Sequence, residues 1–480
     1  MIEHSEHDSD CGTHDLLLKQ KASFVEHGAP DIKIRKANLK KLKAAVLAYR
    51  EQLKSAVSDD FGHRSAHETD LLELFGIIQS IDYMIKNLKK FMKRERRHVG
   101  MYFQSGKAYV DYQPKGVVGI MSPWNYPLSL TLIPLATALA AGNRAMIKPS
   151  ELTPKTSGLI KQLLARTFDE TEVAVVLGDA KVGAQFSRQP FDHLLFTGST
   201  PVGHKVMQAA SEHLVPLTLE LGGKSPAVIA KDHVNNRNIA RLVFGKLANA
   251  GQTCVAPDYV FVHEQDLESF IKHYDEAVKH TYPKGTLSPD YTSIVNNDHY
   301  KRLNSLCEDA RNLGVKVVEV GHFPERASER IRTIAPTLVI EPPNYANIMQ
   351  EEIFGPLLPV KTYTHISEVI GFINSRARPL ALYYFGDKNA ECSALLANTT
   401  SGNVGINNTL MHVAQDDLPF GGIGPSGMGA YHGIEGFKAM SHAKGTYEQG
   451  KLSPVNLLRA PFGRIADFAL NFTLGKSKHR

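Results

Sequence analysis

Cys254 has the sequence surroundings of a reactive thiol. It follows Gly-Gln-Thr at residues 251–253 and precedes Val-Ala-Pro at 255–257, where a core cysteine would have bulky apolar neighbours. A thiol on a flexible loop can be deprotonated and can reach a substrate, whereas a thiol in an apolar core is inert. With an ordinary pKa of about 8.5, a few per cent of such a thiol is thiolate at neutral pH. We therefore predict that Cys254 is a nucleophile.

Glu220 is the candidate general base. It ends a strand-like run over residues 215–220 and is followed closely by Gly222 and Gly223. A carboxylate beside two glycines can move towards a partner, because the glycine backbone adopts dihedral angles that other residues avoid. A thiol nucleophile and a mobile general base together carry out covalent acyl chemistry.

Asn125 lies in a stiff loop that could stabilise an oxyanion. The run Met-Ser-Pro-Trp-Asn-Tyr-Pro at residues 121–127 holds the only tryptophan of the chain between two prolines, which restrict the backbone. A rigid loop can direct the Asn125 amide N–H towards a developing negative charge. The alternative is that Asn125 only forms the turn, which leaves the rigidity of its neighbours unexplained.

A candidate phosphate-binding turn covers residues 196–203, Phe-Thr-Gly-Ser-Thr-Pro-Val-Gly. It follows a predicted strand and precedes a helical stretch, so the backbone N–H groups around Gly198, Ser199 and Gly203 are available to an anion. The run lacks the G-x-G-x-x-G fingerprint, and a simple strand-to-helix turn is the alternative.

Lys148 and Glu151 are candidates for holding a ribose. Both follow a predicted strand of an open α/β sheet, at the end where such sheets bind ligands. An ammonium donor and a carboxylate acceptor three residues apart suit two adjacent hydroxyls, although an exposed ion pair would have the same spacing. A carboxylate here would repel a 2′-phosphate, which favours NAD over NADP.

Hydrophobic spacing predicts the elements that carry these residues. Apolar residues three or four apart predict a helix that Gly62 ends, and Ser65-x-x-Glu68 predicts the capping box of a second helix. The two apolar stripes consist of Leu39, Leu42, Val46, Tyr49, Leu53 and Val57, and of Leu71, Leu74, Phe75, Ile78, Ile85 and Leu88.

From Gly100 onwards, short apolar runs alternate with helical patterns. This alternation predicts parallel, doubly wound sheets, and we expect two α/β units joined near residue 220. The glycine-rich run 420–429 should return the chain along a tight path. The predicted strands cover 108–112, 117–121, 144–148, 173–177, 193–197, 227–230, 259–263, 316–320, 336–340 and 382–385.

Composition favours a globular protein without a nucleic-acid or metal site. The 55 Lys and Arg residues against 49 Asp and Glu give a net charge of +6, and we interpret the basic cluster at 86–97 as a solvated helix face. The four cysteines show no metal-ligand spacing and indicate a reducing compartment. The polar, acidic start and the absence of a long apolar run predict a cytoplasmic protein without a signal peptide or transmembrane helix.

Six short runs agree with a known family. They are Pro-Trp-Asn-Tyr-Pro at 123, Lys-Pro-Ser-Glu at 148, Phe-Thr-Gly-Ser-Thr at 196, Leu-Glu-Leu-Gly-Gly-Lys-Ser-Pro at 219, Gly-Gln-Thr-Cys at 251 and Glu-Ile-Phe-Gly-Pro at 352. Together, and in this order, they resemble the aldehyde dehydrogenase superfamily over roughly residues 30 to 445. The runs 251–259 and 418–432 resemble its class 3 branch, which includes fatty, aromatic and bacterial coniferyl aldehyde dehydrogenases.

The resemblance implies a mechanism. Cys254 attacks the aldehyde, the Asn125 side chain and the Cys254 N–H hold the oxyanion, hydride passes to the nicotinamide, and Glu220 activates the water that hydrolyses the thioester. The substrate would be an aromatic aldehyde such as coniferyl aldehyde, or a medium- or long-chain aliphatic aldehyde. The cofactor would be NAD, with NADP as the alternative. The residues assigned to it are Lys148, Glu151, Gly198, Ser199, Gly203, Glu352, Phe354 and Trp124.

The implied fold is α/β, with two doubly wound parallel-sheet domains and a small β oligomerisation arm. A homodimer is expected, because the segment after His432 does not follow the tetrameric branch, and the amphipathic C-terminal tail is expected to pack on the protein's own surface. The implied divisions are an NAD-binding domain at 1–99 and 114–219, a catalytic domain at 220–430, an arm at 100–113 and 431–450, and a tail at 451–480.

Three other functions are compatible with parts of the pattern. A CoA-acylating aldehyde dehydrogenase would not need a water-activating carboxylate at Glu220. A cysteine hydrolase would pair Cys254 with one of the 21 histidines, but it would leave the ribose and phosphate segments without a role. A non-catalytic scaffold of the same fold would tolerate the loss of Cys254, Glu220 or Asn125, and all three are present. Trp124, Tyr126 and Tyr83 are candidates for lining an apolar access path, and ordinary packing is their alternative.

Overall fold

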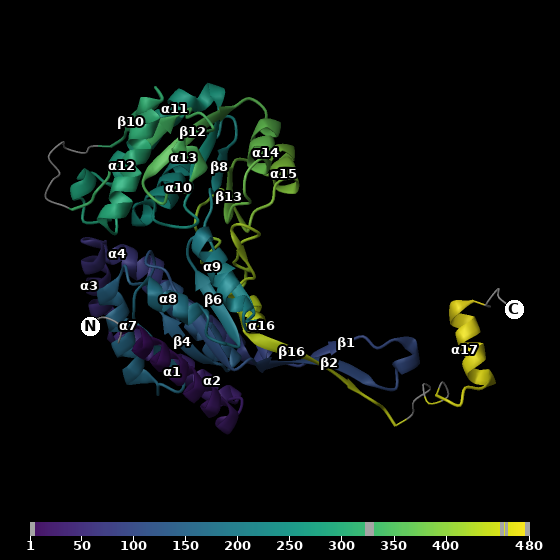
Figure 1. Cartoon of the computed structure of the whole chain (residues 1–480). Coiled ribbons are helices and arrows are strands. Elements are labelled where there is room, and N and C mark those ends of the chain that lie inside the picture. Colours follow the sequence, from purple (N-terminus) through teal and green to yellow (C-terminus); the bar gives the residue numbers. More distant parts are fainter. Residues whose placement is uncertain (1–4, 322–330, 452–455, 457–458, 476–480) are drawn as a thin grey trace.

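Three sheets form the framework of the chain (Figure 1). The computed structural model describes residues 5–321, 331–451, 456 and 459–475. The first sheet has the order β15-β7-β6-β3-β4-β5 and is parallel except for β15. Its strands are β3 (Val117–Met121), β4 (Arg144–Lys148), β5 (Val173–Val175), β6 (His193–Thr197), β7 (Leu217–Glu220) and β15 (Gly427–Met428).

The second sheet has the order β10-β11-β12-β9-β8-β13-β14 and is parallel except at β10. The α/β fold with parallel sheets is thereby confirmed. Strands β12 and β14 were not predicted from the sequence. The strands are β8 (Pro226–Ile229), β9 (Tyr259–His263), β10 (Lys316–Glu319), β11 (Thr337–Ile340), β12 (Leu357–Tyr363), β13 (Ala381–Phe385) and β14 (Asn403–Ile406).

Helices bury the strands of both sheets. Every residue of β3, β6, β9 and β13 is buried, as expected for parallel strands covered on two faces. The helices of the N-terminal half are α1 (Ser5–His27), α2 (Ile32–Ala48), α3 (Arg50–Phe61), α4 (Ala66–Thr69), α5 (Phe75–Phe91), α6 (Ser129–Ala141), α7 (Pro154–Thr167), α8 (Ala180–Ser187) and α9 (Thr200–Ser211). Those that follow are α10 (Asn236–Leu247), α11 (Leu267–Thr281), α12 (Asn297–Asn312), α13 (Asn347–Gln350), α14 (Ile366–Asn374), α15 (Ala390–Asn398), α16 (Gly433–Ala439) and α17 (Arg464–Leu474).

The helix predicted after Ser65 differs from the one observed. A π-helical turn, Asp70–Leu74, separates α4 from α5. Because a π turn holds more residues than an α turn, it rotates the face that follows. Leu71 and Phe75 are therefore 58% and 55% exposed, and the prediction that they are core residues is wrong. The buried face of α5 consists of Ile77, Ser80, Ile81, Met84, Leu88 and Phe91.

The predicted capping box at Ser65 forms only in part. The Ser65 hydroxyl accepts a hydrogen bond from the Glu68 N–H. The Glu68 carboxylate, however, does not return to the helix start. It accepts hydrogen bonds from the Asn249 N–H and the Thr292 hydroxyl, far along the chain. Glu68 therefore joins this helix to the segment that precedes Cys254.

The glycine-rich segment returns the chain to the edge of the first sheet beside Glu220. In β15, Gly427 pairs with Glu220 and Met428 pairs with Leu219. Gly427 has φ +147, a conformation that favours glycine, and a Cβ there would overlap the Leu219 carbonyl oxygen. A tight path was expected from the sequence, and the structure confirms it.

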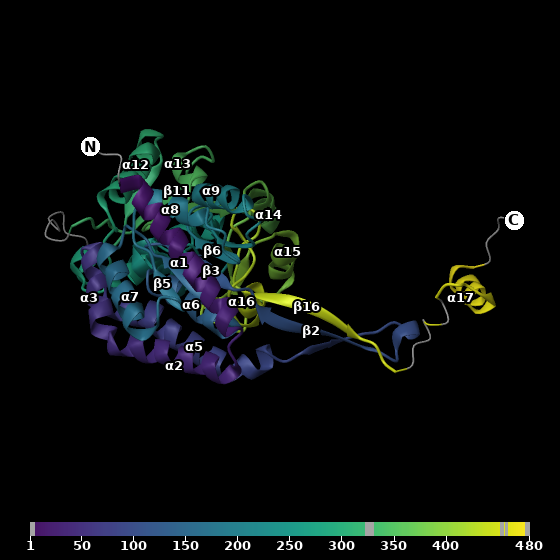
Figure 2. The same cartoon turned by 60° about the horizontal axis from the view of Figure 1, so that its bottom comes forward.

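The third sheet projects from the body as an arm (Figure 1 and Figure 2). It has the order β1-β2-β16 and is antiparallel, with β1 (Glu95–Arg97), β2 (Lys107–Pro114) and β16 (Ser441–Glu448). Beyond its far end, α17 lies away from the body in both views. Phe468, Phe472 and Leu474 are 74%, 75% and 77% exposed, so the expectation that the tail packs on the protein's own surface is wrong for α17.

Candidate active site

Two adjoining cavities bring the predicted site residues together. The first, of about 760 Å³, is lined by Asn125, Glu220, Cys254, Glu352 and Phe354, among others. The second, of about 840 Å³, is lined by Lys148 and Glu151. Both reach the ends of strands β3 and β6, where open α/β sheets bind ligands. Residues common to the two linings make them one cleft: Pro123, Trp124, Thr197, Gly198, Ser199 and His299.

The loop that carries Cys254 is held tightly, which corrects the expectation of a flexible loop. Asn249 and Ala250 have positive φ angles of 53° and 51°, which bend the chain sharply after α10. The Gln252 side chain donates to the carbonyls of Asn249 and Ser293 and accepts a hydrogen bond from the Val295 N–H. Gly and Gln, which suggest mobility in sequence, here form a buried hydrogen-bonded turn.

Burial and neighbouring carboxyl groups act on the Cys254 thiol. The side chain is half-buried. Burial first, and then the charges of Glu352 and Glu220, raise the pKa of the thiol to about 12. The thiol is therefore protonated at neutral pH in this state, contrary to the few per cent of thiolate expected from an ordinary pKa. Formation of the nucleophile requires transfer of the proton to a base.

Glu220 is placed to be that base. Its side chain is 3% exposed, and neither carboxyl oxygen has a hydrogen-bond partner in the part of the chain that the structure describes. Burial raises the pKa of Glu220 well above its usual value, because the charged form is desolvated. A carboxylate in these surroundings has a high proton affinity, which suits it to take a proton from a thiol or from water.

Glu352 folds over the two glycines that follow Glu220. A Cβ at Gly222 would lie 2.6 Å from Glu352 Cδ, so only glycine leaves room for this carboxyl group. The Gly223 N–H donates to it, whereas burial raises its pKa to about 8. The sequence suggested that the glycines give Glu220 its freedom to move. The structure adds that Gly222 makes space for Glu352.

Asn125 directs one N–H of its side-chain amide at the Cys254 loop. Its side chain is 3% exposed, and Nδ2 donates to the Gln252 carbonyl at 3.1 Å. The second N–H of Nδ2 has no acceptor among the described residues. A donor left over at the wall of the cavity that holds Cys254 can bind an oxyanion formed there.

The second cavity has the groups that a dinucleotide requires. Lys148 ends β4, and its Nζ lies 2.9 Å from Glu151 Oε2, which presents a donor and an acceptor side by side. Ser199 precedes the first turn of α9, whose N-terminal N–H groups suit a phosphate. Gly183 leaves room behind the pair, since a Cβ there would lie 3.3 Å from Lys148 Cε. These residues fit a dinucleotide that extends from Glu151 towards Cys254.

Gly203 is absent from the residues that line the two cavities. It lies inside α9, and a Cβ there would lie 2.7 Å from Leu221 Cδ2. Its small size therefore brings α9 close to the segment that follows Glu220.

Aromatic rings form one wall of the cleft. The Trp124 ring lies 5.3 Å from Phe354 and 5.0 Å from His299 between centroids. Tyr126 lies behind the wall, buried, with its hydroxyl 2.7 Å from Thr253 Oγ1. Tyr83 bonds to Asp417 instead and lines neither cavity. Of the three candidates for an access path, Trp124 alone faces the cleft.

Several cleft residues were not predicted from the sequence: Lys224, His299, Arg302 and Arg376. His299 and Arg302 lie on one face of α12, which reads as an ordinary amphipathic surface helix. Lys224 lies within the family run that begins at residue 219, four residues after Glu220, and this was the one signal available for it. In the described ranges, no group of three or more His, Cys, Asp or Glu could hold a metal ion, and no helix is long and apolar enough to cross a membrane.

Comparisons with known proteins agree with this geometry. Residues 18–446 match the sequence model of the Aldehyde dehydrogenase family. The chain is 48% identical to a probable coniferyl aldehyde dehydrogenase of Pseudomonas aeruginosa, over 94% of this chain and 93% of the relative. It is 46% identical to the coniferyl aldehyde dehydrogenase of a Pseudomonas species, over 95% of both.

Solved structures give the same result. The substrate-bound state of Staphylococcus aureus AldH superposes with a TM-score of 0.89 at 39% identity, covering 95% of this chain and 99% of that one. The Mycobacterium tuberculosis aldehyde dehydrogenase complexed with NAD+ superposes with a TM-score of 0.80 at 26% identity, covering 90% and 88%.

Proposed function

Because the chain belongs to the aldehyde dehydrogenase family and is an oxidoreductase that acts on aldehydes, we propose that it forms the free carboxylic acid through a thioester on Cys254. One observation carries the proposal. Cys254, Asn125 and Glu220 line a single cavity that continues into the Lys148–Glu151 pair.

In the first step, the sulfur of Cys254 bonds to the aldehyde carbon as its proton passes to a base, for which Glu220 is best placed. The negative charge that develops on the substrate oxygen is held by the free N–H of Asn125 Nδ2 and by the Cys254 backbone N–H. A dinucleotide held by Lys148 and Glu151 would supply the acceptor for the hydride that leaves the substrate carbon. Glu220 passes the thiol proton to solvent before hydrolysis. It then takes a proton from water as the water oxygen bonds to the thioester carbon. The carbon–sulfur bond breaks, the acid is released, and the proton on Glu220 returns to the sulfur.

The proposed cysteine chemistry is tested with Cys254→Ala. The variant should lose turnover and retain NAD binding, since the sulfur is at the far end of the cleft from Lys148. Mass spectrometry of the wild-type enzyme, quenched during turnover, should find an acyl adduct on the peptide that contains Cys254. Turnover by the alanine variant would refute the assignment.

NAD is supported as the acceptor by the NAD-bound structural relative. We propose that it is preferred to NADP, because the Glu151 carboxylate beside Lys148 would repel a 2′-phosphate. The ratio of kcat/KM values for the two cofactors tests this preference, and Glu151→Gln should narrow the ratio.

An aromatic aldehyde such as coniferyl aldehyde is the proposed substrate. The names of the two Pseudomonas relatives support it, as do the Trp124 and Phe354 rings at the wall of the cavity. A panel of cinnamyl-type and of medium- and long-chain aliphatic aldehydes tests the assignment. A tenfold preference for aliphatic aldehydes would overturn it.

Hydrolysis rather than transfer to CoA is proposed for the thioester, because Glu220 is buried, lines the cavity and has no hydrogen-bond partner among the described residues. Product analysis with and without CoA separates the two reactions.

We also propose that the arm joins two copies of the chain. β16 is an edge strand of its sheet, and an edge offers unpaired backbone groups to a partner. Light scattering of the purified protein measures the resulting mass.

The proposed domains are 1–99 with 114–219 for NAD binding and 220–430 for catalysis. Segments 100–113 and 431–450 form the proposed arm. Limited proteolysis that cuts between these units would support the division.

A further inference from the structure

Arg64 is a fully buried cation that the proposed reaction does not use. Its Nη1 lies 3.0 Å from Glu73 Oε1, and both side chains are 0% exposed. Its Nε and Nη2 have no hydrogen-bond partner within the described ranges. A buried ion pair seldom stabilises a fold more than apolar side chains of the same volume, and unpaired donors add to its cost. Stability alone therefore gives a weak reason for this arginine.

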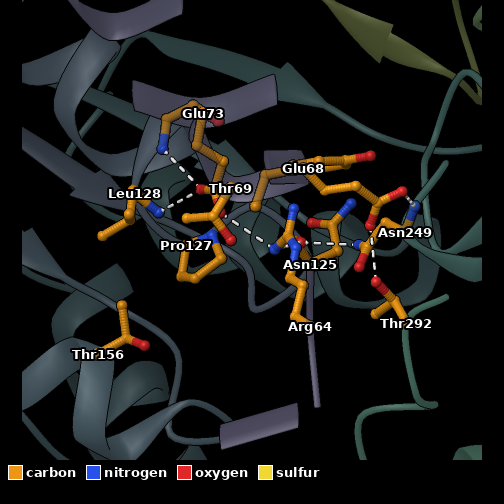
Figure 3. A network of polar contacts seen from close by, with 12 residues as sticks. Arg64, Glu68, Thr69, Glu73, Asn125, Pro127, Leu128, Thr156, Asn249 and Thr292 are labelled. Carbon is orange, nitrogen blue, oxygen red and sulfur yellow. Dashed lines mark hydrogen bonds and ion pairs between the residues drawn. The ribbon is translucent and has the colours of Figure 1, made fainter. Parts of the chain in front are cut away.

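Arg64 contacts the loop that holds the proposed oxyanion donor (Figure 3). Its Nη1 donates to the backbone carbonyl of Asn125 at 3.0 Å. Its guanidinium lies over the Tyr126 ring, 4.8 Å from the centroid. The Tyr126 hydroxyl lies 2.7 Å from Thr253 Oγ1, next to Cys254. One planar group thus touches Asn125 directly and the nucleophile's loop through one intervening ring.

Two buried carboxyl groups fix the surroundings of Arg64. Glu73 Oε2 accepts from the N–H groups of Leu128 and Ser129 at 2.7 and 3.0 Å, at the start of α6. The π turn that displaced the predicted helix face contains Glu73. The start of α6, the π turn and Arg64 are therefore held as one unit.

Glu68 supplies the second anchor. It accepts from the Asn249 N–H at 3.0 Å, and Asn249 Nδ2 donates to the Asn125 carbonyl at 2.9 Å. The carbonyl of Asn125 is thus held from two sides, by Arg64 and by Asn249, while its side-chain amide faces Gln252. Because the backbone of Asn125 is fixed in this way, the direction of its side-chain amide, the proposed oxyanion donor, is fixed as well.

We propose that Arg64 is a positioning residue for the oxyanion site, an inference that rests on the proposed function of Asn125. Lysine is not an equivalent replacement, because its ammonium group has no planar face to stack on the Tyr126 ring while it contacts the Asn125 carbonyl and the Glu73 carboxylate. Loss of an oxyanion donor costs about 10²–10³ in rate, and a displacement of about 1 Å can cost 10²-fold. Arg64→Lys should therefore lower the rate of the first hydride transfer about 10- to 100-fold.

A double-mutant cycle with Asn125 tests the proposal. The four proteins are the wild type, Arg64→Lys, Asn125→Ala and the double variant. The measured quantity is the rate of the pre-steady-state burst of NADH at saturating aldehyde, together with Tm and the Kd for NAD. If Arg64 acts through Asn125, Arg64→Lys should slow the burst at least tenfold alone and less than threefold in the Asn125→Ala background.

Arg35→Lys is the matched control. Arg35 is also buried, and its Nη1 donates to the carbonyls of Ala140 and Ala141 at the other end of α6. It should lower Tm and leave the burst rate within threefold of the wild type. Glu73→Gln, which keeps the shape of the side chain, should act as Arg64→Lys does and replaces it in the cycle if that variant does not fold.

The outcomes separate the two levels of inference. If Asn125→Ala has no effect on the burst, the proposed function of Asn125 fails. If Asn125→Ala slows the burst and Arg64→Lys slows it by the same factor in both backgrounds, Arg64 acts independently and its positioning role is refuted. An equal loss of rate in Arg35→Lys would also overturn the proposal, because a general loosening of α6 would then account for it.

Discussion

Gly222→Ala should weaken NAD binding without unfolding the protein. The added methyl group would lie 2.6 Å from Glu352 Cδ, whereas ordinary contacts begin near 3.4 Å. The backbone at Gly222 lies outside the left-handed region, so alanine adds no backbone strain there. The Glu352 carboxyl group is the end of a flexible side chain and must shift by roughly 1 Å to avoid the methyl group. That shift separates the carboxyl group from the Gly223 N–H, from which it now accepts a hydrogen bond.

The size of the effect follows from the assignment of Glu352 to the dinucleotide site. Hydrogen bonds to a charged group are worth about 1.5–3 kcal/mol. Measured above pH 8, where Glu352 is ionised, its displacement should therefore raise the Kd for NAD about 10- to 150-fold. The assay is direct, because Trp124 is the only tryptophan of the chain and lines both cavities, so its fluorescence should report the bound cofactor.

Two controls make the prediction specific. Gly371→Ala adds a methyl group inside α14 where nothing lies within 4 Å, and it should leave the Kd unchanged. Glu352→Ala should weaken binding by a similar factor, and Gly222→Ala should add little to it. A Kd within twofold of the wild type in Gly222→Ala would refute the placement of Glu352 in the dinucleotide site.

Three further predictions concern the base, the oxyanion donor and the stability of the fold. Glu220→Gln should still form the thioester and fail to hydrolyse it, giving one burst of NADH per site and no steady turnover. In the wild type, hydrolysis should increase with pH through the raised pKa of Glu220, because the ionised form is the base, and quenched-flow analysis measures both steps. Asn125→Ala should slow the chemical step a hundredfold or more, since an oxyanion donor is worth about 2.7–4 kcal/mol. A loss below tenfold in single-turnover measurements would mean that the Cys254 N–H suffices. Burial and the charge of Lys115 lower the pKa of His193 to about 3. The pKa of His193 is lower in the folded than in the unfolded chain. Its contribution to the free energy of unfolding is therefore fully present above about pH 6.5 and is lost as the pH falls towards 3. His193→Gln should flatten this part of a denaturation series, and an unchanged pH dependence would contradict the assignment.

The sequence predicted those parts of the fold and site that depend on local pattern. Strands such as His193–Thr197 are continuous apolar runs because both faces of a parallel sheet are covered. The sequence also identified the candidate site residues by the types of their neighbours, since a reacting group needs stiff or small residues around it. These residues are Lys148, Glu151, Asn125, Glu220 and Cys254. The structure brings these five residues to one cleft.

The failures have a common physical cause, which is contact between distant segments. The π turn at 70–74 cannot be predicted from apolar spacing, because it depends on the contacts of Glu73 with Arg64 and with the start of α6. The turn before Cys254 is rigid only because Glu68, Ser293 and Val295 bind it. His299 carries no local signal at all, since its role depends on where α12 lies.

The pairing of β15 with β7 has a consequence for biosynthesis. A ribosome synthesises Cys254 and Glu220 long before residues 427–428, which close the sheet edge beside Glu220. Residues 441–448, which pair with 107–114, follow later still. Sheet contacts of such long sequence separation form late and slowly. A nascent chain therefore holds its reactive groups in an unfinished cleft until nearly the last tenth of translation, and chains that stop early should be inert.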